Sequence, residues 1–323
     1  MPSTRRRYLR QAGRVGGVLA AGLLGGCSKP VASGTDGPQV PVHVGSKPFS
    51  EQRILGYLAY ERLQEVEGVQ AIDEVGAGDS LANWEATASG ERDLYWEYTG
   101  TAWTQLPPRH DERITDPDRL YERVRAEAAS QGIYTAEPAA FSNEYVVVAD
   151  RTWTEEIGVT TFSELADHLD DGDADLGIAV NEEFYHRQDG WNGLLDYYGV
   201  DADTKTAFES EPFIVTSTGL TYELLKRENI RLASGFATDP QLERPSLVVL
   251  EDDWNYFLPY QPMPTAHAPT VEAHSRILEA LTPVVESLDE ATMRQLNRRV
   301  FIDDQHPNAV AKAHLAALEE RDA

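Results

Sequence analysis

The stretch VPVHVGSKPFSEQRILGYLAYERL, residues 40–63, decides the fold. It opens with valine at every second position, which is the period of a β-strand with one buried face. The segment GSKPF, residues 45–49, then makes a turn, and Ser50 is of a residue type that caps helix N-termini. Apolar residues follow at helical spacing, namely Ile54, Leu55, Leu58, Ala59 and Leu63. A strand, a turn and an amphipathic helix in this order predict an α/β unit.

The same alternation of strands and helices continues along the chain. A second strand is expected to end near Val75, and further strands are expected at 93–98, 145–149, 176–180 and 247–250. Helices are expected at 81–88, 162–169, 191–198 and 219–226, with an all-helical segment from Thr270 onward. The predicted fold class is therefore α/β with mostly parallel sheets and a C-terminal helical segment.

A chain of 323 residues suits two lobes, and 41% hydrophobic residues are enough to build two cores. Ligands of open α/β sheets bind beyond the carboxyl ends of the strands. Several polar and aromatic residues fall at such ends in the predicted pattern, namely Lys47, Tyr98, Thr101 and Tyr260. These residues are the first candidates for a binding site.

The charge balance is strongly acidic, with 54 Asp and Glu against 28 Lys and Arg and a net charge of -26. Nothing in this composition resembles the basic footprint of a nucleic-acid-binding protein, so nucleic acid is not expected as a partner. The acidic residues are spread along the chain and lysine is scarce, which favours a protein adapted to concentrated salt. The alternative is an ordinary secreted protein that its charge keeps soluble.

The N-terminal 27 residues are typical of an export signal. Arg5, Arg6 and Arg7 precede a short apolar segment, and the run resembles the twin-arginine signal. The apolar segment is too short to span a membrane, and it ends at LGGC, which resembles a lipobox with Cys27 as the lipidated residue. Residues 28–39 read as a polar tether. We therefore expect a lipid-anchored protein on the extracytoplasmic face of the membrane.

Signals for catalysis are weak. The chain has no G-x-S-x-G, HExxH or P-loop motif, and its one cysteine excludes a disulfide within the chain and a cysteine-based zinc site. Paired acids of a hydrolase are conceivable at Asp239, Asp252 and Asp253, but in so acidic a chain such pairs are more simply solvated charges. No cofactor or metal is expected, and the chain is not predicted to be an enzyme.

Aromatic residues gather at the edges of the expected elements. EYTGT, residues 97–101, places a tyrosine and two threonines on an expected glycine-containing loop, and FSNEY and WNYFLPY, residues 141–145 and 254–260, are similar clusters. A single tyrosine most often packs in a core. Together, these clusters are also suited to line a cleft.

Six stretches resemble, in the same order, the glycine betaine/choline/proline-betaine substrate-binding proteins of ABC importers. They cover the chain from Val40 to about Asn308 and read GSKPFSEQRILGYLAYERL, ERDLYWEYTGTAW, FSNEYVVV, EEFYHRQDGWNGLLDYYG, GFATDPQLE and VVLEDDWNYFLPYQ. The resemblance implies a periplasmic-binding-protein-like type II fold, a Venus flytrap that encloses its ligand by hinging. It implies a first lobe of residues 40–143 plus 254–323 and a second lobe of residues 144–253.

The resemblance also implies the binding residues. An aromatic cage for the quaternary ammonium falls on Tyr98, Tyr145, Tyr260 and Phe236, and many relatives carry tyrosine at the position of Phe236. Partners for the ligand carboxylate fall on Lys47, Thr101 and Arg187. Asn143 falls on a polar position that helps to close the cage.

The chemistry of these residue types fits a betaine. A trimethylammonium group cannot donate an N–H bond, whereas aromatic faces attract it with about 0.5–2 kcal/mol per good contact. Basic residues suit the carboxylate at the other end of the ligand and favour glycine betaine over choline. Choline, carnitine, proline betaine, proline and another small solute stay open as alternatives. The expected partners are the osmolyte, an ABC permease and the membrane through the lipid anchor; a sensor that feeds a signalling partner is a second class.

Overall fold

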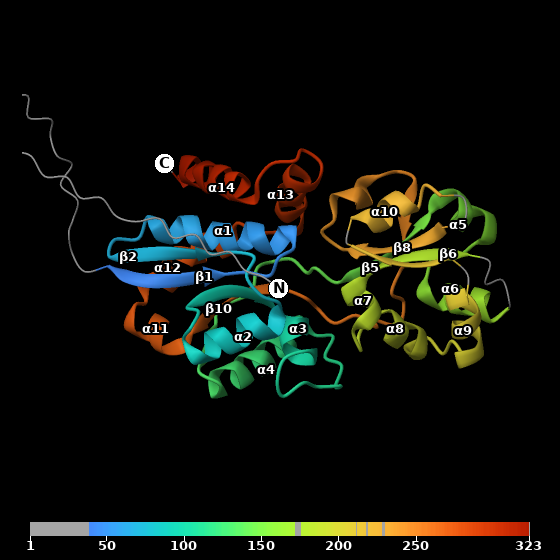
Figure 1. Ribbon diagram of the computed structural model, residues 1–323, viewed down its shortest axis with the longest axis horizontal. Coiled ribbons are helices and arrows are strands. Elements are labelled where there is room, and N and C mark those ends of the chain that lie inside the picture. The colour runs from blue at the N-terminus through green and yellow to red at the C-terminus, as the bar shows by residue number, and fades with distance from the viewer. Residues whose placement is uncertain (1–38, 172–175, 211, 218, 228–229, 323) are drawn as a thin grey trace, which may run out of the picture. The chain divides into compact units, whose positions relative to one another are not determined.

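The computed structural model describes residues 39–322 apart from 172–175, 211, 218 and 228–229. The expected export signal, Cys27 and all but Gln39 of the expected tether lie outside the described residues. In the part of the chain that is described, no helix is both long and apolar enough to cross a membrane. The two sheets discussed below are shown in Figure 1.

The first sheet has five strands in the order β2-β1-β3-β10-β4. β1 runs parallel to β2 and β3, whereas β10 runs antiparallel to both β3 and β4. Helix α1 lies on one face of this sheet and α2 and α4 lie on the other (Figure 1). Its strands are β1 (Val40–Gly45), β2 (Val69–Glu74), β3 (Leu94–Tyr98), β4 (Ile133–Thr135) and β10 (Pro262–His267). Its helices are α1 (Ser50–Gln64), α2 (Ser80–Ser89), α3 (Thr99–Thr104), α4 (Pro117–Ser130), α11 (Ala268–Ala273), α12 (Arg276–Glu286), α13 (Glu290–Phe301) and α14 (Pro307–Asp322).

The second sheet also has five strands, in the order β7-β6-β8-β5-β9. β6 runs parallel to β7 and β8, whereas β5 runs antiparallel to β8 and β9. The strands are β5 (Tyr145–Asp150), β6 (Gly177–Asn181), β7 (Phe213–Thr216), β8 (Ile230–Phe236) and β9 (Leu247–Val249). The helices are α5 (Arg151–Ile157), α6 (Phe162–Asp170), α7 (Glu182–His186), α8 (Trp191–Tyr197), α9 (Ala202–Ser210), α10 (Leu220–Leu224) and the 3-10 helix Pro240–Glu243.

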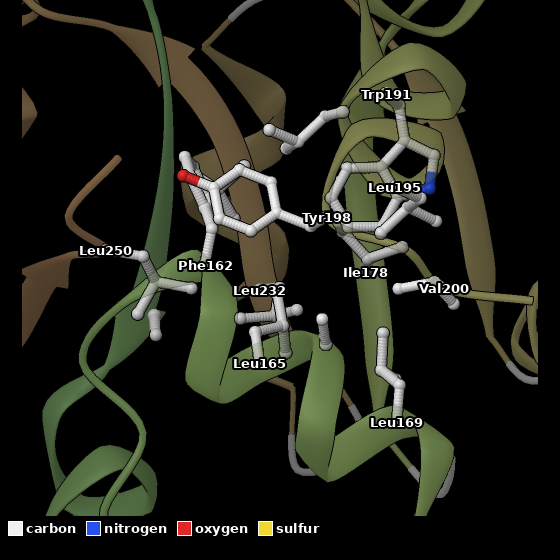
Figure 2. Close-up of a cluster of buried hydrophobic side chains, with 14 of the residues drawn as sticks. Phe162, Leu165, Leu169, Ile178, Trp191, Leu195, Tyr198, Val200, Leu232 and Leu250 are labelled. Atoms are coloured by element: carbon white, nitrogen blue, oxygen red, sulfur yellow. The ribbon is translucent and has the colours of Figure 1, made fainter. Parts of the chain in front are cut away.

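Each sheet has its own buried core, so the described chain forms two α/β lobes. Figure 2 shows the core of the second lobe, where Phe162, Leu165 and Leu169 of α6 lie against Ile178 and Leu232 of the sheet. All five are at most 3% exposed. Burial of a side chain of this size stabilises a fold by roughly 1.5–3 kcal/mol.

In each sheet, four strands run in one direction and one runs against them, as the pairings show. The opposed strand is β10 in the first lobe and β5 in the second, and each is reached by a crossover from the other lobe. The sequence pattern did not predict β10, because Pro262 and Pro264 lack the N–H that a central strand normally donates. Their carbonyl groups still accept bonds from Ala139 and Ala136.

Two local expectations were wrong. Ser50 is the first residue of α1 rather than its N-cap; Phe49 holds the cap position and its side chain makes no capping bond. The EYTGT segment is not a loop, because α3 begins at Thr99. Gly and Thr are poor helix formers, but a Cβ at Gly100 would lie 2.8 Å from the Tyr260 ring, so close packing requires glycine there.

The two crossovers are hydrogen-bonded to each other where they pass between the lobes. The Asn143 N–H donates to the Tyr260 carbonyl at 3.0 Å, and the Tyr260 N–H donates to the Ser142 hydroxyl at 2.9 Å. Both crossovers therefore enter the region between the lobes side by side. Asn143 and Tyr260, two of the predicted site residues, are delivered there by this pairing.

Candidate functional site

All eight ligand-binding residues predicted from the sequence line one small cavity between the lobes. Phe49 and Glu183 complete its lining. The cavity volume is about 30 Å³. The predicted residues in this lining are Lys47, Tyr98, Thr101, Asn143, Tyr145, Arg187, Phe236 and Tyr260.

The register of the two antiparallel strands explains why these residues meet. Tyr98 ends β3 and pairs with Pro262 at the start of β10, two residues after Tyr260. In the second sheet, Tyr145 begins β5 and pairs with Phe236 at the end of β8. An antiparallel strand begins at the edge where its parallel neighbours end. Residues from both directions of the chain therefore gather at one edge of each sheet.

Aromatic rings form a continuous row across the two lobes. Phe49 stacks on Tyr98 at 6.3 Å between ring centroids and on Phe236 at 6.0 Å, with interplanar angles of 17° and 12°. Phe236 in turn contacts Tyr145 at 4.8 Å. Tyr98, Tyr145 and Tyr260 are each 4% exposed, so these rings are withdrawn from water.

Lys47 provides a buried positive charge at the first-lobe end of the cavity. Its Nζ donates to Glu97 Oε1 at 2.5 Å and to the Ser80 hydroxyl at 3.0 Å. It also lies 4.7 Å from the centroid of the Tyr98 ring. The side chains of Lys47 and Glu97 are 8% and 0% exposed, so the pair is almost fully desolvated.

Arg187 provides the positive charge at the second-lobe end. Its Nε and Nη2 donate to the two oxygens of Asp189, both at 2.7 Å, which is a bidentate pair. Nη2 also donates to the Tyr260 hydroxyl at 3.2 Å, and Nη1 donates to Glu183 at 3.2 Å. The guanidinium carbon lies 5.6 Å from the Tyr145 centroid and 5.7 Å from the Tyr260 centroid.

The charges at this end are firmly held in their ionised forms. Burial acts to lower the pKa of Arg187, but Tyr260, Tyr145 and Asp189 raise that pKa well above its ordinary value. Burial acts to raise the pKa of Asp189, but Arg187 and its other donors bring that pKa below the ordinary value. An anion that approached Arg187 would therefore share it with Asp189.

The three tyrosines are held in their neutral forms. Burial, followed by the charge of Glu51, raises the pKa of Tyr98 well above the ordinary value. Burial and Asp189 do the same for Tyr260, and burial and Glu183 do so for Tyr145. Neutral phenol rings carry the electron-rich faces that attract cations.

Asn143 and Thr101 are both buried, at 7% and 3% exposure. Asn143 Nδ2 donates to Glu51 Oε1 at 2.8 Å, and Asn143 Oδ1 accepts from the Thr238 N–H at 3.5 Å and lies 2.9 Å from the Thr238 hydroxyl oxygen. Thr101 lies in the first turn of α3, immediately after β3. Asn143 thus connects the cavity to residues of both lobes.

Two lining residues were missed from the sequence. Phe49 belongs to the GSKPF motif, which supports the family resemblance, but the motif alone does not indicate that its ring lines the cavity. Glu183 lies one turn before Arg187 on α7, and an acid at this spacing from an arginine is a detectable ion-pair signal. Both omissions concern residues next to predicted ones rather than another part of the chain.

The acids of the hydrolase alternative each accept hydrogen bonds from neighbouring donors. Asp239 accepts from the Tyr222 hydroxyl and the Phe236 N–H. Asp252 accepts from Tyr198 and from the backbone of the 256–257 turn. Asp253 accepts from Ser163. Each of the three holds a local backbone segment in place.

Larger cavities share lining residues with the small one. A cavity of about 910 Å³ shares Glu183 and Arg187 with it and continues along α2 and α7. Another, of about 320 Å³, shares Phe49, Asn143 and Phe236. Two rings of the row, Phe49 and Phe236, therefore line both the small cavity and the cavity of about 320 Å³.

The chain matches known proteins over most of its length. Residues 40–317 match the family described as the substrate binding domain of ABC-type glycine betaine transport system. A glycine-betaine-binding protein of Pseudomonas aeruginosa is 32% identical over 84% of this chain and 85% of its own length. A substrate-binding protein of a chemotactic signal transduction system, CosB of Halobacterium salinarum, is 32% identical over 79% of this chain and 78% of its own.

Solved structures agree on the fold. Apo YehZ of Escherichia coli is 24% identical, with a TM-score of 0.63 over 86% of this chain and 98% of its own. A glycine betaine/carnitine/choline ABC transporter protein is 21% identical, with a TM-score of 0.67 over 85% of this chain and 98% of its own. The predicted two-lobed type II binding-protein fold is confirmed. The chain belongs to the family of substrate-binding domains of ABC-type glycine betaine transport systems.

Proposed function

We propose that this substrate-binding protein of an osmolyte importer captures glycine betaine, or a similar quaternary-ammonium osmolyte, in the aromatic cage between its lobes and delivers it to an ABC permease. The observation that carries this proposal is the meeting of five aromatic rings and two basic side chains from both lobes at one buried cavity. Rings and cations in this arrangement match the two ends of a betaine.

Energetics support an aromatic site for the ammonium end. Each desolvated ring contributes about 0.5–2 kcal/mol to a cation, so three or four rings support micromolar affinity after the costs of association. In the structure, Lys47 and Arg187 are cations that lie near Tyr98, Tyr145 and Tyr260. A bound trimethylammonium group therefore competes with the protein's own cations for these rings.

The volume of the cavity requires a conformational change on binding. A space of about 30 Å³ holds one or two waters, whereas a ligand of about eight non-hydrogen atoms needs several times more. Entry therefore requires the lobes to separate, as in a hinge mechanism. We place the hinge in the paired crossovers, with a first lobe of residues 40–143 plus 254–323 and a second lobe of residues 144–253.

The basic residues of the cavity favour ligands with a carboxylate, such as glycine betaine, over choline. Lys47, Thr101 and Arg187 line the cavity where a ligand carboxylate can be received, and choline has none. Each cation already has a carboxylate partner, so the gain from a ligand carboxylate is smaller than for a free arginine or lysine. Glycine betaine is expected to bind more tightly than choline, and tighter choline binding would overturn this ranking.

Isothermal titration of the purified protein with glycine betaine at about 1 M salt tests the proposal. Choline, carnitine, proline betaine and proline serve as competing ligands. We expect one-to-one micromolar binding that is lost in Tyr98→Ala and weakened in Arg187→Ala. Tyr134→Ala is the matched control, because Tyr134 is 43% exposed on β4 and does not line the cavity. A folded sample that binds no quaternary ammonium would refute the proposal.

A second candidate function is favoured by the relative from Halobacterium salinarum, whose name places it in a chemotactic signal transduction system. The same ligand-loaded protein would then present itself to a signalling receptor rather than to a permease. Deletion of the gene separates the two roles. Loss of labelled glycine betaine uptake supports transport, whereas intact uptake with lost migration toward glycine betaine supports signalling.

The location of the protein is proposed from its first 39 residues. We propose export through the twin-arginine pathway and lipidation at Cys27, which place the protein on the extracytoplasmic face of the membrane. Replacing Arg5 and Arg6 with lysine should block export, and Cys27→Ala should release the exported protein from the membrane fraction. Export of the lysine variant at the normal rate would contradict the twin-arginine assignment.

Adaptation to salt is proposed from the net charge of -26. At about 1 M salt the screening length is roughly 3 Å, which suppresses repulsion between surface carboxylates. Cooperative thermal unfolding should be lost on dialysis into dilute buffer. An unchanged melting profile there would show that the acidic surface serves solubility only.

A further inference from the structure

Glu51 is a buried carboxylate that the proposed function does not use. It lies in the first turn of α1 and is 2% exposed. Among the described residues it forms no ion pair with a lysine, arginine or histidine, although removing a carboxylate from water is costly without one. Burial raises the pKa of Glu51, while hydrogen bonds from four neighbouring side chains act in the opposite direction.

The four hydrogen bonds divide evenly between its two oxygens. Oε1 accepts from the Tyr98 hydroxyl at 2.7 Å and from Asn143 Nδ2 at 2.8 Å. Oε2 accepts from the Thr238 hydroxyl at 2.5 Å and from Asn297 Nδ2 at 2.8 Å. The carboxylate of Glu51 thus connects Tyr98 and Asn143, through one oxygen, with Thr238 and Asn297, through the other.

These partners come from different parts of the fold. Tyr98 ends β3 and Asn297 lies in α13, both in the first lobe, whereas Thr238 follows β8 in the second lobe. The bond between Glu51 and Thr238 is therefore a contact between the lobes. It is buried at both ends, since Thr238 is 1% exposed.

The hydrogen bond between Glu51 and Thr238 lies close to the row of aromatic rings. Thr238 lies two residues after Phe236, and Phe49 lies two residues before Glu51. Phe49 stacks on both Tyr98 and Phe236, so the ring row bridges the lobes directly beside the bond between Glu51 and Thr238.

We propose that Glu51 is a positioning residue that couples the closed arrangement of the lobes to the cage, by holding Tyr98 and Asn143 with one oxygen and Thr238 of the opposite lobe with the other. Separation of the lobes breaks the bond to Thr238 while the bond to Tyr98 stays within the first lobe. Closure and alignment of the cage are then linked through one side chain. This inference rests on the proposed function only for the ligand used in the binding experiment.

The kinetic test uses Glu51→Gln and Thr238→Val with glycine betaine as the probe. Glutamine keeps the size of the side chain but has one oxygen in place of two, so it cannot accept all four bonds. Because both variants weaken the closed complex, we expect dissociation to be roughly 10-fold to 100-fold faster and association to change by less than about 3-fold. Glu61→Gln is the matched control, since Glu61 lies on the same helix and outside the cavity.

Combination of the two variants identifies the shared bond. If Glu51 and Thr238 act through one contact, the double variant should dissociate no faster than Glu51→Gln alone. Multiplied effects would show that the two residues act separately and would overturn the proposal. A Glu51→Gln variant that behaves like Glu61→Gln would overturn it as well.

A ligand-free readout separates this inference from the proposed function. The protein with Cys27→Ser receives spin labels through Glu85→Cys on α2 and Asp203→Cys on α9, both exposed positions. Without ligand, Glu51→Gln and Thr238→Val should each shift the distance distribution between the labels toward longer distances. Unchanged distributions in both variants would refute the coupling, whereas failure to bind glycine betaine alone would refute only the proposed ligand.

Discussion

The two lobes build their halves of the site by the same topological means and then hold them differently. Each has a central parallel strand that ends at the cavity, β3 or β8, and beside it an antiparallel strand that begins there, β10 or β5. The first lobe thereby presents Tyr98 and the second presents the pair of Tyr145 and Phe236. Equivalent positions of equivalent sheets supply the rings, so the sheet topology decides where the candidate site lies.

What differs is the support behind the rings. In the first lobe the Tyr98 hydroxyl is fixed by the buried carboxylate Glu51. In the second lobe Phe236 has no hydroxyl, and its backbone N–H is bound by Asp239 at 2.9 Å instead. A side chain therefore anchors one ring and the backbone anchors the other. The position of the Tyr98 ring should therefore be sensitive to changes in the Glu51 side chain. The position of the Phe236 ring should depend on the backbone turn that Asp239 holds.

The ion pairs of the two buried cations, Lys47 and Arg187, also differ between the lobes. Lys47 and Glu97 form a pair that is almost fully desolvated. Arg187 and Asp189 form a bidentate pair in which Asp189 is 15% exposed and a cavity of about 910 Å³ adjoins the arginine. Both cations are 8% exposed, but Asp189 borders water whereas Glu97 is fully buried. Removal of a partner should therefore be more damaging in the first lobe.

The largest expected effect tests this difference in stability. Glu97→Gln leaves the Lys47 charge buried without compensation and should lower the free energy of unfolding by about 3–5 kcal/mol. Asp189→Asn should cost about 1–3 kcal/mol, because Arg187 keeps its contact with Glu183 and borders solvent. Chemical denaturation of both variants measures the two values.

A surface pair provides the control. Lys226 and Glu223 are 66% and 48% exposed, so Glu223→Gln should change the free energy of unfolding by less than about 1 kcal/mol. Equal losses in Glu97→Gln and Asp189→Asn would contradict the asymmetry between the lobes.

The next largest effect is a pH-dependent change in stability at Asp239, which binds the backbone N–H of Phe236. Burial raises the pKa of Asp239 from 3.8 to about 6. A raised carboxyl pKa means that the folded state binds the proton more tightly than the unfolded state does. Its contribution to stability is complete below about pH 4 and is lost as the pH rises to about 6, by about 3 kcal/mol.

Asp239→Asn isolates this contribution, because other carboxyl groups with lowered pKa, such as Asp189, change stability in the opposite direction. The free energy of unfolding of the native protein minus that of Asp239→Asn should fall between pH 4 and pH 6 and then stay level. A difference that is constant from pH 4 to pH 7 would show that Asp239 has an ordinary pKa.

The sequence predicted which aromatic residues line the cavity far better than it predicted the residues that hold those rings in place. Tyr98, Tyr145, Phe236 and Tyr260 were located through motifs, and all four line one cavity. Motifs succeed here because residues at strand ends are brought together by sheet topology alone. The strand pattern also located β1, β3, β5, β6 and β9 within one or two residues.

The supports were missed because they depend on long-range packing. Glu51 was one acid among 54, and nothing local shows that its partners lie 187 and 246 residues away. Helix α3 was expected to be a loop, since Thr99 and Gly100 disfavour helices, and only the approach of Tyr260 explains the glycine. Patterns at short spacing carry no information about such contacts.

A smaller effect is expected from making the first-lobe ring resemble the second. Tyr98→Phe keeps the ring face but removes the donor to Glu51, and it should weaken glycine betaine binding by about 10-fold, or about 1.4 kcal/mol. Titration calorimetry measures the change. An unaltered affinity would indicate that the hydroxyl does not position the ring, and the comparison with Phe236 would then lose its physical basis.

The smallest effect is expected from the reverse substitution. Phe236→Tyr adds a hydroxyl to the second-lobe ring, and tyrosine attracts a cation somewhat more strongly than phenylalanine. Phe236 borders both the cavity of about 30 Å³ and the cavity of about 320 Å³, so the added oxygen meets open space on one side. Affinity for glycine betaine should rise by up to about 5-fold, or about 1 kcal/mol, in the same titration. A loss of affinity would show that phenylalanine at this position is selected by the packing of Phe49 and Tyr145 rather than tolerated, because only a crowded ring row would reject one more oxygen.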